Sequence, residues 1–555
     1  MANPHIPIDR RTNRVELIGL VLGILLAIAV YKIFPANAGD IALAAAKGKK
    51  LHVEAMPVVA AVAALMAVWW MTEAIALPAT ALVPMVAFPV LGVDAFKVVA
   101  APYASDTIYL FMGGFVLALA MQRWNLHTRI ALAIVLLVGT SPRRLVAGFM
   151  VATGFLSMWV SNTATAIMML PVGLSVLHLV GRLTTQKWTF TAIEDVANLD
   201  EISRKGVQGG VMNTIFHKGR DIAKEIKEKT SSFSSNFGIS LMLGIAYAAS
   251  IGSVGTIIGT PPNALLVAYM KNEFSIEIGF FDWMLVGVPL SVVMLAACWF
   301  LLTYVLFKPE IGEIPNGKKV IQDELDKLGP ITVPEKLVGV IFVVAATCWI
   351  SLGFVLKSFD IKIASLDAII AMSTAILLFI VPANKSGERL IDWDSAKKLP
   401  WDILILFGGG LSLSAQFSSS GLSLWIGHQV SALGALPTSA IIMAVVTLVI
   451  FLTEITSNTA TAAAFLPVIA GVSAGLGYSG ANMMLFTIPV AMAATFAFML
   501  PVATPPNAIA YGSGYVKISS MIKAGIWLNI IGIFLITATV VFIASAVFGL
   551  KFTLI

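Results

Sequence analysis

The chain has 555 residues, of which 58% are hydrophobic and only 12% are charged, against roughly 25% charged residues in an average soluble domain. This composition excludes a water-soluble globule. Apolar runs of about 20 residues, long enough to cross a hydrocarbon core of roughly 30 Å, follow one another along the chain. The sequence therefore predicts an all-α polytopic membrane protein surrounded by lipid. In such a protein the net charge of +6 reflects basic residues beside the apolar spans, which indicate the side of the membrane that each loop faces. No nucleic-acid partner is therefore expected.

Continuous apolar segments predict about eleven membrane crossings. They lie near residues 15–34, 54–70, 72–92, 107–122, 237–270, 283–307, 336–355, 364–382, 400–427, 483–511 and 523–549. The first segment is interpreted as a retained span and not as a signal peptide, because no small-residue cleavage site follows a short apolar core.

Two further apolar stretches, 145–180 and 439–475, are each interrupted at the middle by the string Ser-Asn-Thr-Ala-Thr. Their flanking arms have about 15 to 18 residues, fewer than the roughly 20 of a full crossing. Non-helical backbone at membrane depth is tolerated only where protein buries it or where it lines a watery cavity. We therefore expect two re-entrant hairpins whose tips face a cavity.

The basic residues predict which side of the membrane each loop faces. Of the 36 Lys and Arg residues, 25 lie in the N-terminus, 123–144, 181–236, 308–336 and 385–398. By the positive-inside rule these segments are cytoplasmic, and an odd number of crossings places the C-terminus outside. The polar segment 181–236 is interpreted as a cytoplasmic insert. The expected location is the cytoplasmic (inner) membrane of the cell.

The chain contains an internal repeat. An offset of 296 residues aligns Phe111, Gly113 and Gly114 with Phe407, Gly409 and Gly410, and the same offset aligns the two Ser-Asn-Thr-Ala-Thr strings. A second string, Thr-Pro-Pro-Asn-Ala, begins at Thr260 and again at Thr504, and the 181–236 insert accounts for its shorter offset. Five predicted crossings separate the two tips, so equivalent hairpins enter from opposite faces. This is an inverted-topology repeat, which is typical of secondary transporters.

The two motifs supply oxygen ligands for a hard monovalent cation such as Na⁺. Hydroxyl, amide and backbone oxygens come from two matched sets, Ser157, Ser161 and Asn162 in the first half and Thr453, Ser457 and Asn458 in the second. Each double proline breaks its span, because proline lacks an N–H and disfavours helical geometry in the residue before it. The breaks free carbonyls around Gly259 and Ala503 to complete the two cation shells.

The same tips favour an anion. A helix begins directly after each Asn-Thr pair, and the free N–H groups at a helix start attract negative charge. Neither the tips nor the Thr-Pro-Pro-Asn blocks contain Lys or Arg, so bound cations would have to supply the countercharge.

The residues that common enzymes need for catalysis are absent from the sequence. The chain has no His-Glu-x-x-His, Gly-x-Ser-x-Gly or P-loop string, and its two cysteines, Cys298 and Cys348, lie in apolar spans. We therefore expect neither an enzyme nor an organic cofactor. Glu454, beside the second tip, could carry protons, but the preferred interpretation is a buried carboxylate that accepts hydrogen bonds within the hairpin.

The paired Ser-Asn-Thr tips and the two Thr-Pro-Pro-Asn blocks resemble the divalent anion/sodium symporter family, the INDY-type carriers of dicarboxylates, citrate and sulfate. The resemblance covers nearly the whole chain. It implies eleven spans with two hairpins, a homodimer, and elevator transport, in which a domain bearing the hairpins slides against a dimeric scaffold. The long 181–236 insert departs from compact members of the family.

The resemblance also assigns residues to sites. The first sodium site matches Ser157, Ser161, Asn162 and Gly259, and the second matches Thr453, Ser457, Asn458 and Ala503. The residues that would hold substrate carboxylates are Asn162, Thr163, Ser457, Asn458 and Thr459, with Thr260 and Thr504 near the cavity.

The chain divides accordingly. The scaffold is expected to comprise mainly 1–144 and 308–438. The hairpins are expected at 145–180, on the cytoplasmic side, and at 439–475, on the outer side. The rest of the transport domain is expected to comprise 237–307 and 483–555, each of which contains a broken helix and the span that follows it. The predicted function is sodium-coupled import of a small dianion, a C4-dicarboxylate such as succinate. Alternatives are a sodium-independent dicarboxylate exchanger, citrate or sulfate as the substrate, and, from another class, an anion channel. The sequence does not fix the number of Na⁺ ions per substrate.

Overall fold

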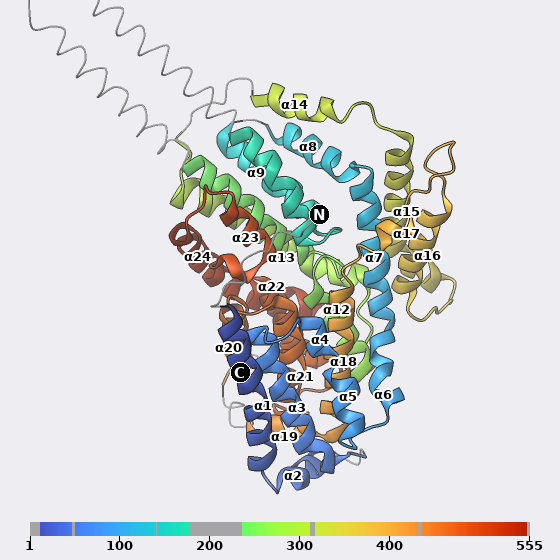
Figure 1. Ribbon diagram of the computed structural model, residues 1–555, viewed down its shortest axis with the longest axis vertical. Coiled ribbons are helices and arrows are strands. Elements are labelled where there is room, and N and C mark those ends of the chain that lie inside the picture. The colour runs from blue at the N-terminus through green and yellow to red at the C-terminus, as the bar shows by residue number, and fades with distance from the viewer. Residues whose placement is uncertain are drawn as a thin grey trace, which may run out of the picture.

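The computed structural model describes residues 12–46, 50–139, 141–177, 236–310, 317–430 and 436–551. Helices dominate these residues (Figure 1). By length and apolar composition, nine helices in these ranges could cross a membrane. The chain is thus an all-α, multi-pass membrane protein, as predicted. The predicted insert, apart from Asn236, lies outside the described residues.

The helices before the insert follow most of the predicted spans. They are α1 (Thr12–Ile33), α2 (Ala38–Ala45), α3 (Met56–Thr72), α4 (Leu77–Ala81), α5 (Val83–Val90), α6 (Phe96–Ala100), α7 (Asp106–Arg123), α8 (Leu126–Val138), α9 (Pro142–Ser157) and a helix at Asn162–Leu177, with 3₁₀ turns at Val53–Ala55 and Ala101–Ala104. The segment 123–144 was predicted to be a loop, and this prediction was wrong. It forms α8, whose apolar stretch is too short to read as a span.

The helices after the insert begin with Asn236–Ser253. They continue with α12 (Pro261–Phe274), α13 (Phe280–Phe300) and its π-helical extension Leu301–Leu306, α14 (Gly317–Lys327), α15 (Val333–Ser358), α16 (Leu366–Ile380), α17 (Trp393–Ala396), α18 (Trp401–Ser420), α19 (Leu422–Gln429), α20 (Thr438–Thr453), α21 (Asn458–Gly475), a 3₁₀ turn at Gly480–Met483, α22 (Met484–Thr495), a 3₁₀ turn at Pro501–Ala503, α23 (Pro505–Gly512), α24 (Ile518–Ala538), a π-helical turn at Thr539–Ala544 and α25 (Ser545–Phe548).

Several predicted spans are shorter than a full crossing. The segments predicted at 72–92, 364–382 and 483–511 contain helices of fewer than 18 residues, whereas α21, the second arm of a predicted hairpin, is long enough to count among the nine. Prolines explain two of these cases, because α4 and α5 each begin near a proline and the 483–511 segment is interrupted before α23.

The glycines of the repeat allow helices from opposite halves to touch. An added Cβ at Gly113 of α7 would lie 2.5 Å from the Ala371 backbone oxygen of α16, and one at Gly409 of α18 would lie 2.4 Å from that of Ala81 in α4. In Figure 1, α7 runs beside α16 and α18 lies beside α4. The rings of Phe111 and Phe407, equivalent residues of the repeat, pack against each other with their centroids 5.1 Å apart. A twofold axis between the repeats would produce this exchange of partners.

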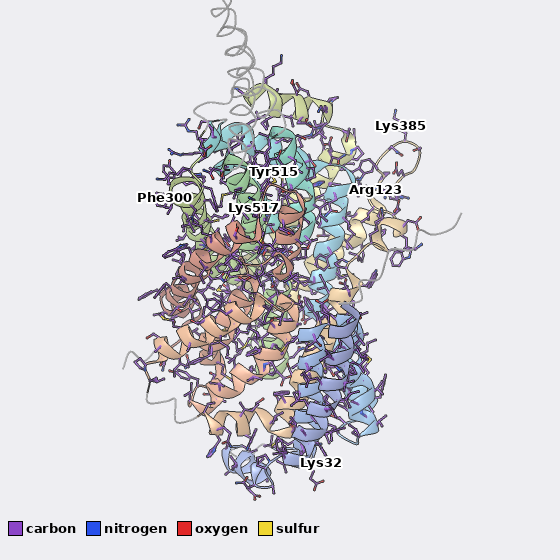
Figure 2. All side chains as sticks on the ribbon, turned by 60° about the vertical axis from the view of Figure 1, so that its left-hand side comes forward. Lys32, Arg123, Phe300, Lys385, Tyr515 and Lys517 are labelled. Atoms are coloured by element: carbon purple, nitrogen blue, oxygen red, sulfur yellow. The ribbon has the colours of Figure 1, made fainter. Side chains whose placement is uncertain are left out.

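Three of the segments predicted to be cytoplasmic, 123–144, 308–336 and 385–398, lie at one end of the described part of the chain. Arg123 pairs with Glu388 (2.6 Å) and Asp392 (2.5 Å), and α14 packs against α8. Figure 2 shows Arg123 and Lys385 toward one end of the long axis and Lys32 at the other. The described parts of the segments 123–144, 308–336 and 385–398 therefore lie together.

Candidate functional site

The first Ser-Asn-Thr string lies where two helices meet at a short turn. α9 ends at Ser157, and the next helix begins at Asn162. The Ser161 hydroxyl accepts a hydrogen bond from the backbone N–H of Ala164 (3.3 Å), and Asn162 Oδ1 accepts one from the N–H of Thr163 (2.8 Å). These side chains satisfy N–H groups that the start of a helix leaves free.

The second string has the same arrangement. α20 ends at Thr453, and α21 begins at Asn458 with Ser457 as its N-cap. The Thr453 hydroxyl lies 2.8 Å from Asn458 Oδ1 and 2.8 Å from the backbone oxygen of Ala494. Both predicted tips therefore form at the start of a helix, where N–H groups and polar side chains are available together.

Each Thr-Pro-Pro-Asn block closes a non-helical break. The helix Asn236–Ser253 stops, and α12 begins at Pro261; in the second half, α22 stops and α23 begins at Pro505. The residues before the prolines have nearly equal backbone angles, with φ −144° and ψ 143° at Thr260 and φ −145° and ψ 149° at Thr504. Proline requires this extended conformation of its predecessor, and the predicted breaks are confirmed.

The first tip is attached to the first break. The Ser157 hydroxyl donates a hydrogen bond to the backbone oxygen of Ala249 (2.6 Å). Gly259 lies so close to this junction that an added Cβ would be 2.2 Å from the Ser253 carbonyl oxygen and 3.0 Å from that of Ser157. Backbone oxygens therefore converge around Gly259, where a cation ligand was predicted.

The second tip is attached to the second break by Glu454, which is 3% exposed. The N–H groups of Phe498 and Met499 donate to its Oε1 at 2.7 and 2.9 Å, that of Leu500 donates to Oε2 at 3.2 Å, and Asn529 Nδ2 donates to Oε1 at 2.8 Å. The expected hydrogen-bond acceptor is confirmed, but its donors were predicted within the hairpin and this was wrong. They come from the break, whose N–H groups lack helical partners, and from α24.

Each break also contacts the helix that precedes the other break. Thr260 Oγ1 lies 3.4 Å from Thr495 Oγ1 at the end of α22, and the Tyr247 hydroxyl donates to the backbone oxygen of Phe498 at 2.8 Å. Thr504 instead caps its own helix, α23. Because each tip contacts its break and each break contacts the helix that precedes the other break, all four motif blocks belong to one connected region.

The predicted residues differ in exposure within this region. The partly exposed ones are Ser161, Asn162, Thr163, Ser457 and Asn458, and the buried ones are Ser157, Gly259, Thr260, Thr453, Thr459, Ala503 and Thr504. Tip side chains are therefore accessible to a ligand, while buried hydroxyls and backbone support them. Sequence reasoning missed Tyr247 and the asparagines of the two Thr-Pro-Pro-Asn blocks, although the recurrence of asparagine in both blocks was a usable signal.

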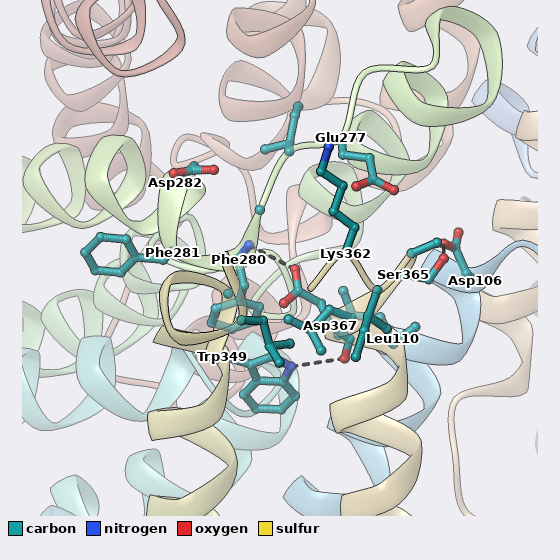
Figure 3. Close-up of a pocket in the computed structure, with 18 of the residues that line it drawn as sticks. Asp106, Leu110, Glu277, Phe280, Phe281, Asp282, Trp349, Lys362, Ser365 and Asp367 are labelled. Atoms are coloured by element: carbon teal, nitrogen blue, oxygen red, sulfur yellow. Dashed lines mark hydrogen bonds between the residues drawn. The ribbon is translucent and has the colours of Figure 1, made fainter. Parts of the chain in front are cut away.

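A separate cavity of about 750 Å³ lies where α12 and α13 meet α7 and α16 (Figure 3). Lys271 of α12 bonds Asp106 Oδ2 of α7 (2.5 Å) and the Ser365 hydroxyl before α16 (2.9 Å). The backbone N–H of Phe280 donates to Asp367 Oδ2 at 3.0 Å, as Figure 3 shows. These contacts join segments predicted to belong to the transport domain and to the scaffold.

Known proteins resemble the whole chain. A family model described as the sodium:sulfate symporter transmembrane region matches residues 18–549. The sodium-dependent dicarboxylate transporter SdcS of Staphylococcus saprophyticus is 39% identical over 548 residues, which cover 98% of this chain and 94% of that protein. The transporter of the same name from Staphylococcus aureus strain USA300 is 39% identical over 541 residues, 96% of this chain and 92% of that protein. The chain belongs to the sodium:sulfate symporter family, which the predicted divalent anion/sodium symporter resemblance identified.

Proposed function

We propose that this protein is a sodium-coupled secondary transporter that imports a small dianion, a C4-dicarboxylate such as succinate, and that it is not an enzyme. The relatives named as sodium-dependent dicarboxylate transporters support this assignment. The observation that carries it is the convergence of two matched tips and two matched breaks, which presents hydroxyl, amide and carbonyl oxygens beside helix N-termini.

The chemistry of the tips explains why sodium would be needed. Bringing a dianion to the middle of a membrane without countercharge costs several kcal/mol or more. Each helix N-terminus offers about half a charge, and neither tip string contains Lys or Arg. Na⁺ ions held by Ser161 and Asn162 in one half and by Ser457 and Asn458 in the other would supply the remainder.

The ligand sets follow from the two halves. One Na⁺ would be held by Ser157, Ser161, Asn162 and Gly259, and another by Thr453, Ser457, Asn458 and Ala503. The substrate carboxylates would bind Asn162, Thr163, Ser457, Asn458 and Thr459, with Thr260 and Thr504 behind them. The residues that belong to the two helix starts, except Thr459, are partly exposed, and the others in these sets are buried.

Transport would proceed by an elevator-type movement in a homodimer within the cytoplasmic membrane, with the N-terminus inside and the C-terminus outside. The domain of the two hairpins and breaks would move against a scaffold made from 1–144 and 308–438. Partner exchange between α7 with α16 and α18 with α4 supports an inverted repeat. Two tips that enter from opposite faces favour an alternating-access mechanism over an open channel.

The test is uptake of labelled succinate into proteoliposomes with and without an inward sodium gradient. Uptake should rise sigmoidally with Na⁺ and fall steeply when choline replaces it. It should carry net positive charge inward if more than two Na⁺ accompany each dianion. Competition by unlabelled citrate and sulfate ranks the candidate substrates. Equal succinate binding in sodium-free buffer would favour the alternative, a sodium-independent exchanger.

A further inference from the structure

The asparagine of each Thr-Pro-Pro-Asn block holds the backbone of its own break. Asn263 Nδ2 lies 3.2 Å from the carbonyl oxygen of Val254 and 2.8 Å from that of Thr256. Asn507 Nδ2 makes the matched pair of hydrogen bonds, at 3.0 and 3.1 Å, to two carbonyls of the second break. Both side chains are fully buried. The repeat therefore preserves a side-chain clamp as well as a sequence.

Each clamp uses only the donor end of the amide. Within the described part of the chain, Oδ1 of Asn263 and Oδ1 of Asn507 are buried without a hydrogen-bond partner. A buried acceptor left unpaired costs free energy. Both equivalent positions have this unpaired oxygen. We infer that the two donated hydrogen bonds contribute more than the unpaired oxygen costs.

The held carbonyls lie in the segments that approach the tips. In the first half, the break between the clamped carbonyls and Pro261 contains Gly259, which is in contact with the carbonyl groups of Ser253 and Ser157. A break releases several carbonyls at once, and any of them could turn away from an ion. Fixing two of them restricts the directions that the remaining carbonyls can take.

We propose that Asn263 and Asn507 are positioning residues for the two sodium sites. By holding two carbonyls of each break, they keep the Gly259 and Ala503 segments in the conformation that a cation requires, and they do not touch the dianion. This inference rests on the proposed function and adds to it a pair of residues outside both predicted ligand sets.

The test uses purified full-length protein and the variants Asn263→Asp and Asn507→Asp. Aspartate has nearly the shape of asparagine but offers no N–H to the carbonyls. We expect the Na⁺ concentration for half-maximal succinate uptake to rise about tenfold in each variant, as for two lost hydrogen bonds. The succinate KM at saturating Na⁺ should stay within about twofold of the wild type, since neither residue touches substrate. Asn272→Asp, at an exposed position on α12, is the control and should behave like the wild type.

A second measurement separates positioning from simple stabilisation. Addition of Na⁺ without substrate should raise the melting temperature of the wild type and of the control, and this rise should be lost or strongly reduced in both Asp variants. If either Asp variant does not fold, Asn263→Ser and Asn507→Ser retain one donor each and should give intermediate Na⁺ affinity.

The outcomes are distinct. Folded variants with a wild-type sodium response, even at a lower melting temperature, would overturn the positioning role and leave the proposed function standing. A wild-type protein whose stability and uptake ignore Na⁺ would overturn the proposed function itself.

Discussion

The two halves of the site share a backbone plan but stabilise it differently. At the position where Glu454 binds three N–H groups of the second break, the first half has Met158, whose side chain packs close to Gly255. Gly259 has no room for a Cβ, whereas its equivalent in the second half is Ala503. Besides the asparagine clamp that both breaks have, the first break is thus held by close packing and by a hydrogen bond from Trp283 Nε1 to the Val254 carbonyl (2.9 Å), and the second by a buried carboxyl group.

The far ends of the two broken helices differ as well. Lys271, near the end of α12, is bound to Asp106 of α7, in a segment assigned to the scaffold. In the second half, Tyr515, just beyond α23, packs on Gly238 of the helix that begins at Asn236, in the same predicted domain. The repeat thus preserves tips, breaks and asparagine clamps, while the attachments around them differ.

The largest expected effect comes from the feature that both halves share. Asn162→Ala and Asn458→Ala should each reduce succinate uptake by about 100-fold or more, because each removes a proposed cation ligand and a carboxylate donor together. Proteoliposome uptake measures the loss, and elution as folded protein on gel filtration confirms that each variant folds. Asn272→Ala is the matched control. Near-normal uptake by either tip variant would show that one half of the repeat serves folding alone.

The next effect tests the difference between Glu454 and Met158. In Glu454→Gln an NH₂ group replaces an oxygen that accepts backbone N–H groups, and a buried donor left unpaired costs about 1–3 kcal/mol. We expect a lower melting temperature in detergent and slower uptake. Met158→Leu, at the equivalent position, should change both little, because volume is nearly conserved. Similar melting temperatures for the two variants would remove the proposed asymmetry.

A smaller effect separates the hydroxyls of Thr453 and Ser157. The Thr453 hydroxyl contacts both Asn458 and the Ala494 carbonyl near the end of α22, whereas the Ser157 hydroxyl contacts the Ala249 carbonyl. Thr453→Val should weaken apparent Na⁺ affinity by about tenfold and also raise the succinate KM, since it releases Asn458. Ser157→Ala should weaken Na⁺ affinity by about fivefold with little change in KM. Sodium titrations of uptake at several succinate concentrations measure both the apparent Na⁺ affinity and the succinate KM. An unchanged KM in Thr453→Val would contradict the link to Asn458.

The smallest effect concerns the Lys271–Asp106 pair. Both side chains are about a quarter exposed, so the pair contributes about 1 kcal/mol, or roughly a fivefold shift between conformations. Lys271→Asp should change the uptake rate by this factor, because the proposed movement has to break the pair. Adding Asp106→Lys should restore the rate. Failure of the double variant to recover would indicate that packing, or the second ion pair of Lys271 with Glu277 (2.9 Å), carries this contact.

The membrane class, the hairpin tips and the helix breaks could be predicted from the residues alone. These features depend on local chemistry: apolar segment length, the missing N–H of Pro261 and Pro505, and polar strings that cap the helices following them. The repeat offset also indicated that the two halves would match, and the structure confirms this match in the angles of Thr260 and Thr504.

Which polar groups pair with one another could not be predicted from the residues alone. Glu454 accepts hydrogen bonds from Phe498 and Asn529, and Lys271 reaches Asp106, across dozens to more than a hundred residues of chain. Buried polar groups need hydrogen-bond partners, and folding brings these partners together from distant parts of the chain. The spacing of residues in the sequence does not predict which distant groups become neighbours. α8 was missed for a related reason, because an apolar stretch shorter than a span becomes identifiable as a helix only once its packing against α9 and α14 is known.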